Sequence, residues 1–425
     1  MSGEFRIQGV SITELARKYG TPHFVYDGDL LRSQYGDLRR DLDPAMEMFF
    51  SLKANPNISI CRLLSSLGAR AEVSSLTELV TARRAGVDPQ NIIFLGPGKS
   101  TAELIACLDE GIYAIVCESF EELRVLDGLA RERGIRAPVA LRVNPNFAVK
   151  GSRLTMGGKP RQFGIDQDQL MNSRDLIGEY PGLHIIGIHA YMGTRILDED
   201  VVVENTTRIF TMAEEIAAAL GIQLEVVDVG GGLGIAYFEN ESDLDPALLA
   251  AKLNPVIADF RQRHPGARLI MELGRYLTAP SGTYVVGVRY VKESMGERFA
   301  VADGGTNHHM AAVGVGSFVK RNFPLELLNR PAGDELMPWQ ITGPLCTPND
   351  TIGKNVALPV LHAGDLLGVR RSGAYGPTAS PVHFLSHGYP AEVLIDGGRD
   401  HLIRSADTVE DLLARQICFD ALPTT

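Results

Sequence analysis

The sequence predicts an α/β protein in which a parallel (β/α)8 barrel is followed by a β-rich domain. The first observation is that β-rich runs alternate with helical stretches through two thirds of the 425 residues, as in repeated βα units. The second is that about eight such runs occur, the number that closes a parallel barrel. The third is that strand-like runs separated by Gly, Pro and Asn replace the helical periodicity after about residue 279.

The barrel strands are expected to be buried on both faces. Val, Ile and Phe dominate these runs without clean alternation, which is typical of a parallel sheet covered by helices. We expect the strands at residues 46–53, 71–74, 91–95, 113–118, 138–143, 185–192, 224–229 and 268–272.

Amphipathic stretches between the strands carry helix start and stop signals. Ser100 and Glu103 form a capping-box pattern that opens a helix ended by Gly111. Further helices are expected over residues 121–133, 201–220 and 246–263.

Strands in the β-rich region are expected at residues 283–290, 298–301, 366–369 and 392–395. The strand-like residues 24–26 at the N-terminus are expected to pack against this region. The expected organisation is a barrel over residues 26–279 and a β-domain made of residues 1–25 and 280–425.

Composition excludes several classes of function. Forty-one Lys and Arg against 52 Asp and Glu give a net charge of −11, which argues against a nucleic-acid surface. No window approaches the roughly 18 apolar residues of a membrane helix, and the N-terminus lacks a secretory pattern. The five cysteines are unclustered, so we expect neither a disulfide framework nor a metal site. A cytoplasmic enzyme is the resulting expectation.

Lys53 is the first candidate for chemistry, because residues at the carboxyl ends of barrel strands face the active site. It lies at the expected end of strand one, in the run FSLKANP at 50–56. A lysine there is either a solvated side chain or a Schiff-base lysine, whose ammonium loses its proton in a partly desolvated barrel mouth.

A phosphate site is indicated by the run GGGLG at 230–234, which follows the seventh strand. Successive glycines expose backbone amides to a phosphate, although such clusters are more often simple turns. Barrels often bind phosphate after strand seven, and Arg275 after strand eight would add a guanidinium. A phosphate site and a reactive lysine at one barrel mouth suggest pyridoxal 5′-phosphate.

Glu272, in strand eight, indicates which pyridoxal chemistry is favoured. A carboxylate beside the pyridine nitrogen keeps it protonated and makes the ring a stronger electron sink. Enzymes similar to alanine racemase place an arginine there, so Glu272 favours decarboxylation over racemisation. A structural pairing of Glu272 with Arg275 is the alternative.

The chain resembles the fold-type III decarboxylases, the family of diaminopimelate and ornithine decarboxylases, from about residue 20 to 400. The motifs that carry the resemblance occur in the family's order: KAN at 53–55, SSLTE at 74–78, RVNP at 142–145, QFGI at 162–165, GIHAYMGT at 187–194, GGGLG at 230–234, ELGR at 272–275, DGG at 303–305, GPLC at 343–346 and GAYG at 373–376. The resemblance implies an alanine-racemase-type barrel with a C-terminal β-domain.

The resemblance also implies the roles of individual residues. Lys53 would carry the cofactor as an imine, Glu272 would bind the pyridine nitrogen, and Cys346 would help to protonate the carbanion. Cys346 would reach the site across a homodimer interface, unless it is simply a buried thiol. The implied cofactor contacts are Lys53, Glu72, Arg142, His189, Tyr191, Thr194, Gly230, Gly231, Gly232, Glu272, Arg275 and Tyr375.

Four positions depart from the family pattern. Glu72 stands where the family has an aspartate near the ring, and Tyr191 replaces the histidine that stacks on it. Diaminopimelate decarboxylases have an arginine near the position of Ala311, which binds the distal carboxylate of the substrate. They have a glutamate at the position of Thr347, which binds the distal ammonium group. A site without them is expected to hold a free diamino acid weakly.

Three runs resemble a subgroup that includes a butirosin-pathway decarboxylase of a glutamyl group carried by an acyl carrier protein: DGGTNHHM at 303–310, RNFP at 321–324 and CTPND at 346–350. We therefore expect a decarboxylase of a carrier-tethered aminoacyl group in specialised-metabolite biosynthesis, such as that of an antibiotic. A free amino-acid decarboxylase is the alternative, while a racemase and a non-catalytic pyridoxal-phosphate carrier are disfavoured. The expected substrate contacts are Thr347, Asp350, Arg321 and His309.

Two features of this interpretation depend on exposed polar groups. His308 and His309 are expected either to form a polar rim of the site or to have no catalytic duty. Acyl carrier proteins are generally acidic, so docking needs a basic patch, and Lys320 with Arg321 is the only candidate.

Overall fold

The computed structural model describes residues 3–147, 154–155, 159–313, 321–331 and 335–419. The chain folds as two compact units. One unit is the continuous segment Gly28–Ser281, and the other combines Met1–Asp27 with Gly282–Thr425.

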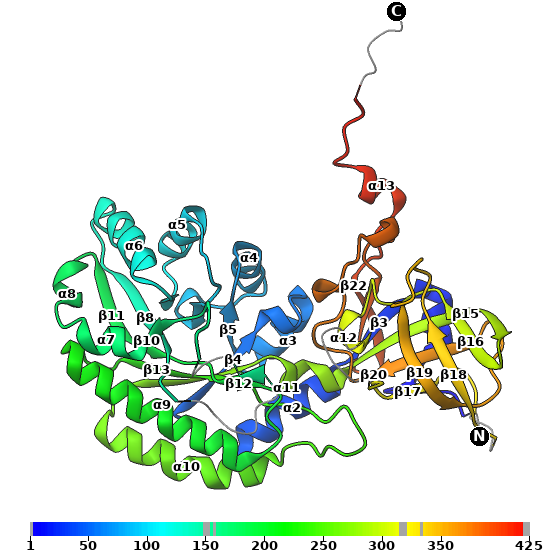
Figure 1. The fold of residues 1–425 in the computed structure, drawn as a ribbon, viewed down its shortest axis with the longest axis horizontal. Helices are drawn as coiled ribbons and strands as arrows, with labels where there is room; N and C mark the ends of the chain where they lie inside the picture. The colour runs from blue at the N-terminus through cyan, green and yellow to red at the C-terminus, as the bar shows by residue number, and fades with distance from the viewer. Residues whose placement is uncertain (1–2, 148–153, 156–158, 314–320, 332–334, 420–425) are drawn as a thin grey trace, which may run out of the picture. The chain divides into compact units, whose positions relative to one another are not determined.

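The continuous unit is a closed parallel barrel (Figure 1). Parallel pairing runs in the order β8, β11, β13, β14, β4, β5, β6 and β7, and β7 pairs with β8 to close the circle. The strands are β4 (Met46–Ser51), β5 (Arg70–Val73), β6 (Ile92–Phe94), β7 (Ala114–Cys117), β8 (Ala137–Asn144), β11 (Leu183–His189), β13 (Val226–Gly231) and β14 (Arg268–Leu273). The predicted fold class is confirmed.

Helices surround the barrel and follow the expected signals. The helix α5 (Thr101–Glu110) opens on the Ser100–Glu103 capping box and ends at Gly111, whose φ is +62°. The other long helices are α2 (Gly28–Asp41), α3 (Ile58–Ser66), α4 (Leu76–Arg84), α6 (Phe120–Glu132), α9 (Glu199–Leu220) and α10 (Pro246–Arg263).

The barrel interior is a packed apolar core below the strand ends. Side chains from most of the strands form one buried cluster, which contains Phe49, Ile93, Leu95, Ala114, Val116, Ala140, Ile186, Val226 and Ile270. Because this cluster fills the interior, polar side chains at the carboxyl ends of the strands are left to build the site.

The second unit is built on a sheet that mixes both ends of the chain. Its pairing runs in the order β19 (Thr351–Leu358), β18 (Met337–Thr342), β16 (Glu297–Ala302), β15 (Gly282–Ser294), β3 (His23–Asp27), β21 (Ala391–Asp396) and β22 (Arg399–Arg404). The strand β20 (Leu366–Arg370) also pairs with β15. Within the described part of the chain, no helix combines the length and apolar character needed to cross a bilayer.

At two strand ends the difference from the prediction moves a predicted site residue out of its strand. The first strand stops at Ser51, and Lys53 lies in the short 3-10 helix η1 (Leu52–Ala54) that follows. The sixth strand stops at His189, so Tyr191 lies beyond it. In both places an apolar run extends past the last strand pairing, and the sequence pattern alone does not mark that point.

Candidate active site

Lys53 lies at the carboxyl end of the first barrel strand, between two acidic side chains. Its Nζ donates to Oε2 of Glu72 at 2.9 Å and lies 3.9 Å from Oε2 of Glu272. Both glutamates are buried, whereas the lysine side chain is 35% exposed. The amino group is therefore held at the barrel mouth on a side chain that is partly exposed.

Two glutamates act on this lysine, Glu72 on β5 and Glu78 in the helix α4. Glu72 also accepts from Oγ of Ser74 at 2.8 Å, so each of its oxygens has a partner. Glu78 accepts from the backbone N–H of Ser74 at 2.7 Å. Burial, followed by the negative charge of Glu72, raises the pKa of Glu78 to about 7. Glu78 belongs to the SSLTE motif, but it is not among the predicted site residues.

Glu272, on β14, forms a buried pair with His189 on β11. His189 Nε2 lies 3.1 Å from Oε1 of Glu272, and both side chains are almost fully buried. Burial lowers the pKa of His189, so we assign a neutral ring that donates from Nε2. Burial alone would raise the pKa of Glu272, but the His189 hydrogen bond and the Lys53 charge together lower it to about 2. Glu272 is therefore an anion.

Asp228, on β13, completes a buried acidic cluster that sequence reasoning missed. One carboxylate oxygen each from Asp228 and Glu272 and a ring nitrogen of His189 lie within 4.8 Å of one another. Burial, followed by the charge of Glu272, raises the pKa of Asp228 well above its usual range. The available signal was a single acid inside the apolar run 226–229.

The glycine run, which begins inside β13 and continues beyond it, brings the backbone into very close contacts. A Cβ on Gly231 would lie 1.6 Å from the carbonyl oxygen of Glu272, and one on Gly232 would lie 2.1 Å from that of Gly193. The φ angles of Gly230 and Gly232 are +65° and +99°. Only glycine satisfies these contacts and angles together.

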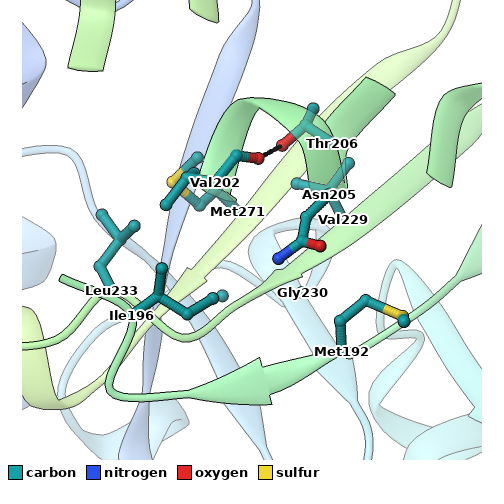
Figure 2. Close-up of a pocket in the computed structure, with 10 residues that line it drawn as sticks. Met192, Ile196, Val202, Asn205, Thr206, Val229, Gly230, Leu233 and Met271 are labelled. Carbon is teal, nitrogen blue, oxygen red and sulfur yellow. Dashed lines mark hydrogen bonds between the residues drawn. The ribbon is translucent and has the colours of Figure 1, made fainter. Parts of the chain in front are cut away.

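A small pocket lies behind this glycine run, between it and α9 (Figure 2). Its lining is mostly apolar and comprises Met192, Ile196, Val202, Asn205, Thr206, Val229, Gly230, Gly231, Leu233 and Met271. Thr206 is turned away from the glycine run, since its hydroxyl donates to the carbonyl of Val202 at 3.0 Å. The pocket thus separates this part of the glycine run from the side chains of α9.

Tyr191, Thr194 and Arg275 lie around the same region. A Cβ on Gly230 would lie 2.8 Å from the Tyr191 ring, whose centroid is 5.9 Å from Nζ of Lys53. Thr194 follows Gly193 in the short strand β12 (Gly193–Thr194). Arg275 begins the helix α11 (Arg275–Thr278) directly after β14.

Arg275 and Arg142 each have an aromatic or acidic partner. Nη1 of Arg275 donates to the Tyr237 hydroxyl at 2.9 Å. Nη1 of Arg142 donates to Glu118 at 2.5 Å, and both of these side chains are buried. Arg142 therefore acts on the site chiefly through its charge, which helps to lower the pKa of Glu272.

In the second unit, Cys346 and Thr347 lie on the loop between β18 and β19. Cys346 is exposed and is not part of a disulfide, so it is not a buried structural thiol. Asp350, predicted to contact substrate, is buried instead, and its carboxylate accepts from the backbone N–H groups of Thr306 at 2.7 Å and Leu345 at 2.8 Å. Asp350 thus links the loop that carries Cys346 to the segment that contains Thr306.

The polar rim suggested for His308 and His309 is wrong. The two side chains are 4% and 0% exposed, and Nε2 of His309 lies 2.8 Å from the Ser372 hydroxyl.

Tyr375 is half-buried with φ +55°, and Arg321 is exposed. Lys320, the other half of the suggested basic patch, lies outside the described residues.

The barrel residues fit pyridoxal 5′-phosphate. The glycine run places consecutive residues without side chains at the carboxyl end of β13, with positive φ at Gly230 and Gly232, and such a backbone suits a phosphate. Oε2 of Glu272 is a buried anionic oxygen with no hydrogen-bond partner among the described residues, which suits a protonated ring nitrogen. Lys53 supplies a primary amine beside it. A phosphate site, an acceptor for a ring N–H and an amine for a carbonyl are the three groups this cofactor requires.

Comparison with known proteins agrees with this geometry. Residues 29–279 match the family model described as "Pyridoxal-dependent decarboxylase, pyridoxal binding domain". The chain is 40% identical, over 96% of both proteins, to the L-glutamyl-[BtrI acyl-carrier protein] decarboxylase of Niallia circulans. It is 30% identical to the diaminopimelate decarboxylase of Helicobacter pylori strain J99, over 95% of this chain and 97% of that protein.

A solved structure extends the agreement to the whole fold. The diaminopimelate decarboxylase of M. jannaschii superimposes with a TM-score of 0.89 at 28% identity, covering 98% of this chain and 97% of that one. With the family model matched across the barrel and relatives matched along nearly the full length, the chain belongs to the pyridoxal-dependent decarboxylases, which confirms the predicted family, cofactor and reaction class.

Proposed function

We propose that this decarboxylase removes the α-carboxylate of an aminoacyl group tethered to an acyl carrier protein, in the biosynthesis of a specialised metabolite. The observation that carries the decarboxylation chemistry is the buried, anionic Glu272 beside Lys53. The tethered substrate is favoured by the uncharged side chains at Ala311 and Thr347. The similarity to a decarboxylase of a glutamyl-carrier substrate supports the same choice.

We assign the cofactor contacts as follows. The glycine run, Thr194, Arg275 and Tyr375 bind the phosphate, and Tyr191 packs on the ring. Glu272 accepts from the ring nitrogen, and Lys53 supplies the amine for the carbonyl carbon. When bound, pyridoxal phosphate accepts the electron pair that remains when the carboxylate leaves as CO2.

The acidic side chains around Lys53 are proposed to accept the proton that its ammonium group loses. Lys53 must lose a proton before its amino group can act as a nucleophile. Oε2 of Glu72, at 2.9 Å, is placed to receive that proton. Glu78 contributes a second group that changes charge near neutrality, because its pKa is raised to about 7.

Glu272 is proposed to favour decarboxylation over racemisation. Its carboxylate stays charged at neutral pH because its pKa is lowered to about 2. A fixed negative charge at the ring nitrogen keeps that nitrogen protonated and strengthens the electron sink. This arrangement suits the loss of CO2.

The distal end of the substrate is proposed to meet a site without charges. Ala311 and Thr347 are both half-buried and neutral. A tethered substrate tolerates this, because docking of the carrier supplies binding energy far from the reacting carbon. Arg321 is exposed and is the described candidate for contact with an acidic carrier.

A homodimer with shared active sites is part of the proposal. Cys346 of the partner subunit would help to protonate the carbanion, as the family resemblance implies. The exposure of Cys346 on a loop held by Asp350 supports a role outside its own fold.

A comparison of two substrate forms tests the tethered assignment. The value of kcat/KM is measured for a series of aminoacyl carriers and for the same amino acids in free form, with the amine product identified by mass spectrometry. We expect a preference of at least about 10²-fold for one carrier-bound form, equivalent to about 2.7 kcal/mol of remote binding energy.

A preference for a free amino acid would overturn the tethered assignment and favour the alternative, a decarboxylase of free amino acids. Release of CO2 from neither form would overturn the decarboxylase assignment itself.

A further inference from the structure

Asp228 and Glu272 form a buried carboxyl pair on neighbouring strands, and the proposed reaction explains only Glu272. Each is 2% exposed, and one oxygen of each lies within 4.8 Å of the other. Two full negative charges this close in a buried environment repel strongly. One of the two carboxyl groups is therefore expected to hold a proton.

The contacts identify which one stays ionised. Glu272 faces His189 Nε2 at 3.1 Å and Lys53 Nζ at 3.9 Å, and both stabilise an anion. The His189 ring also lies within 4.8 Å of Asp228, but Asp228 forms no ion pair with a lysine or arginine among the described residues. Its Oδ1 accepts from the backbone N–H of Gly230 at 2.8 Å.

The remaining oxygens point to a shared proton. Oδ2 of Asp228 and Oε2 of Glu272 are buried, and neither has a hydrogen-bond partner among the residues that the structure describes. A proton on Asp228 would convert that carboxyl into a donor and Glu272 into its acceptor. A carboxylate oxygen has two lone pairs, so Glu272 would still accept from the ring nitrogen.

We propose that Asp228 is a positioning residue that keeps a proton and donates it to Glu272 in a hydrogen bond, so that the pair carries one negative charge, located on Glu272. This inference rests on the role proposed above for Glu272. The directions of the pKa shifts agree, since burial and Glu272 raise the pKa of Asp228 while that of Glu272 is lowered.

The groups around the pair come from five other positions in the barrel. The titratable and charged side chains that face it are His189 on β11, Lys53 on η1, Glu72 on β5, Arg142 on β8 and Glu118. Through Gly230, Asp228 also links the pair to the glycine run. One carboxyl group thus connects the proposed electron-sink contact with the phosphate cradle.

The Asp228→Asn substitution separates a protonated Asp228 from an ionised one. Asparagine keeps an acceptor for Gly230 and a donor for Glu272, and it cannot ionise. If Asp228 is protonated, the variant should bind pyridoxal phosphate with a Kd within about threefold of wild type at neutral pH. A loss of affinity of about 10²-fold would show that the anion is needed.

Thermal stability against pH gives a readout that does not depend on activity. Above the unfolded-state pKa of about 3.8, the folded protein would hold a proton that the unfolded chain has released. Wild type then loses stability as pH rises toward the raised pKa, whereas Asp228→Asn does not. The Tm of the variant minus that of wild type should therefore increase from about pH 4.5 to about pH 7.5.

Asp365→Asn is the matched control. Burial alone would raise the pKa of Asp365, but its pairing with Arg330 lowers it, so this residue is already ionised across the same range. The Tm difference of this variant should stay flat. A flat or falling difference for Asp228→Asn would overturn the proposal.

Infrared spectroscopy of the holoenzyme supplies a direct signature. Glu78, whose pKa is raised to about 7, contributes a carboxylic-acid band of its own, so the difference spectrum between wild type and Asp228→Asn is measured. That difference should show the carbonyl stretch of one protonated carboxylic acid present in wild type and lost in Asp228→Asn. Absence of that band from the difference spectrum would also overturn the proposal. Neither readout involves decarboxylation, so failure of the proposed function would leave both results interpretable.

Discussion

Lys53 and Lys99 are two lysines that follow barrel strands, and their burial and contacts differ in a way that bears on reactivity. Nζ of Lys99 donates to the carbonyl of Val116 at 2.6 Å and to Glu122 at 2.8 Å, and its side chain is 1% exposed. The Lys53 side chain is 35% exposed beside the glutamates. Burial and two partners make Lys99 a structural lysine, so it serves as a matched control.

Borohydride reduction of the holoenzyme should fix the cofactor on the peptide that contains Lys53. The reason is that reduction converts a lysine imine into a stable amine, and Lys53 has the accessible amino group. We expect Lys53→Ala to lose both the adduct and the near-visible absorbance band, and Lys99→Ala to retain them if it folds. Peptide mass spectrometry locates the adduct, and its appearance on another lysine would refute the site assignment.

At the scale of elements, the approach of β13 to β14 depends on Gly231. An alanine there would place its Cβ 1.6 Å from the carbonyl oxygen of Glu272, so the strands would have to separate. We expect Gly231→Ala to lose several kcal/mol of stability and to weaken pyridoxal phosphate binding. Thermal unfolding and a cofactor titration measure the two effects.

Gly128 provides the control for this substitution. It lies inside α6, and a Cβ added there would meet no atom within 4 Å, so Gly128→Ala should stabilise the helix by about 0.5–1 kcal/mol. Equal effects of the two substitutions would show that the close strand contact is not what Gly231 provides.

The elements were predicted well where burial and pattern agree. Each of the eight barrel strands lies within a few residues of its expected range, because a strand covered on both faces leaves a continuous apolar run. The ends of the strands were less certain. Lys53 and Tyr191 were placed in strands, although strand pairing stops before both of them.

The site residues that the sequence indicated most clearly are those whose combination suits few other roles. Lys53, Glu272 and the glycine run stood out because few other roles suit them together. Asp228 was missed because a single acid in an apolar run has no periodicity to identify it. The burial of Asp350 was not expected, because its two backbone donors come from separate segments of the chain, which the sequence does not place together.

At the scale of the whole molecule, mixing two inactive variants tests the proposed shared site. Lys53→Ala and Cys346→Ala subunits should together form heterodimers in which one of the two sites contains both wild-type residues. Activity should recover to about a quarter of the wild-type value in an equal mixture, because about half of the dimers would be heterodimers with one intact site each.

The recovery must be compared with a demonstration of subunit exchange, for example by mass spectrometry of differently tagged chains. Exchange without recovery would show that each chain builds its site alone. Recovery without exchange would show that one of the variants was not inactive.

The position of β3 sets an order on folding during synthesis. Its residues His23–Asp27 are synthesised before the barrel segment, yet they pair with β15 and with β21 (Ala391–Asp396), which are synthesised after it. The barrel segment lies wholly between these strands and contains all of its own strand partners. The barrel can therefore assemble before β3 has its partners, and the sheet of the second unit is completed only after β21 has been synthesised.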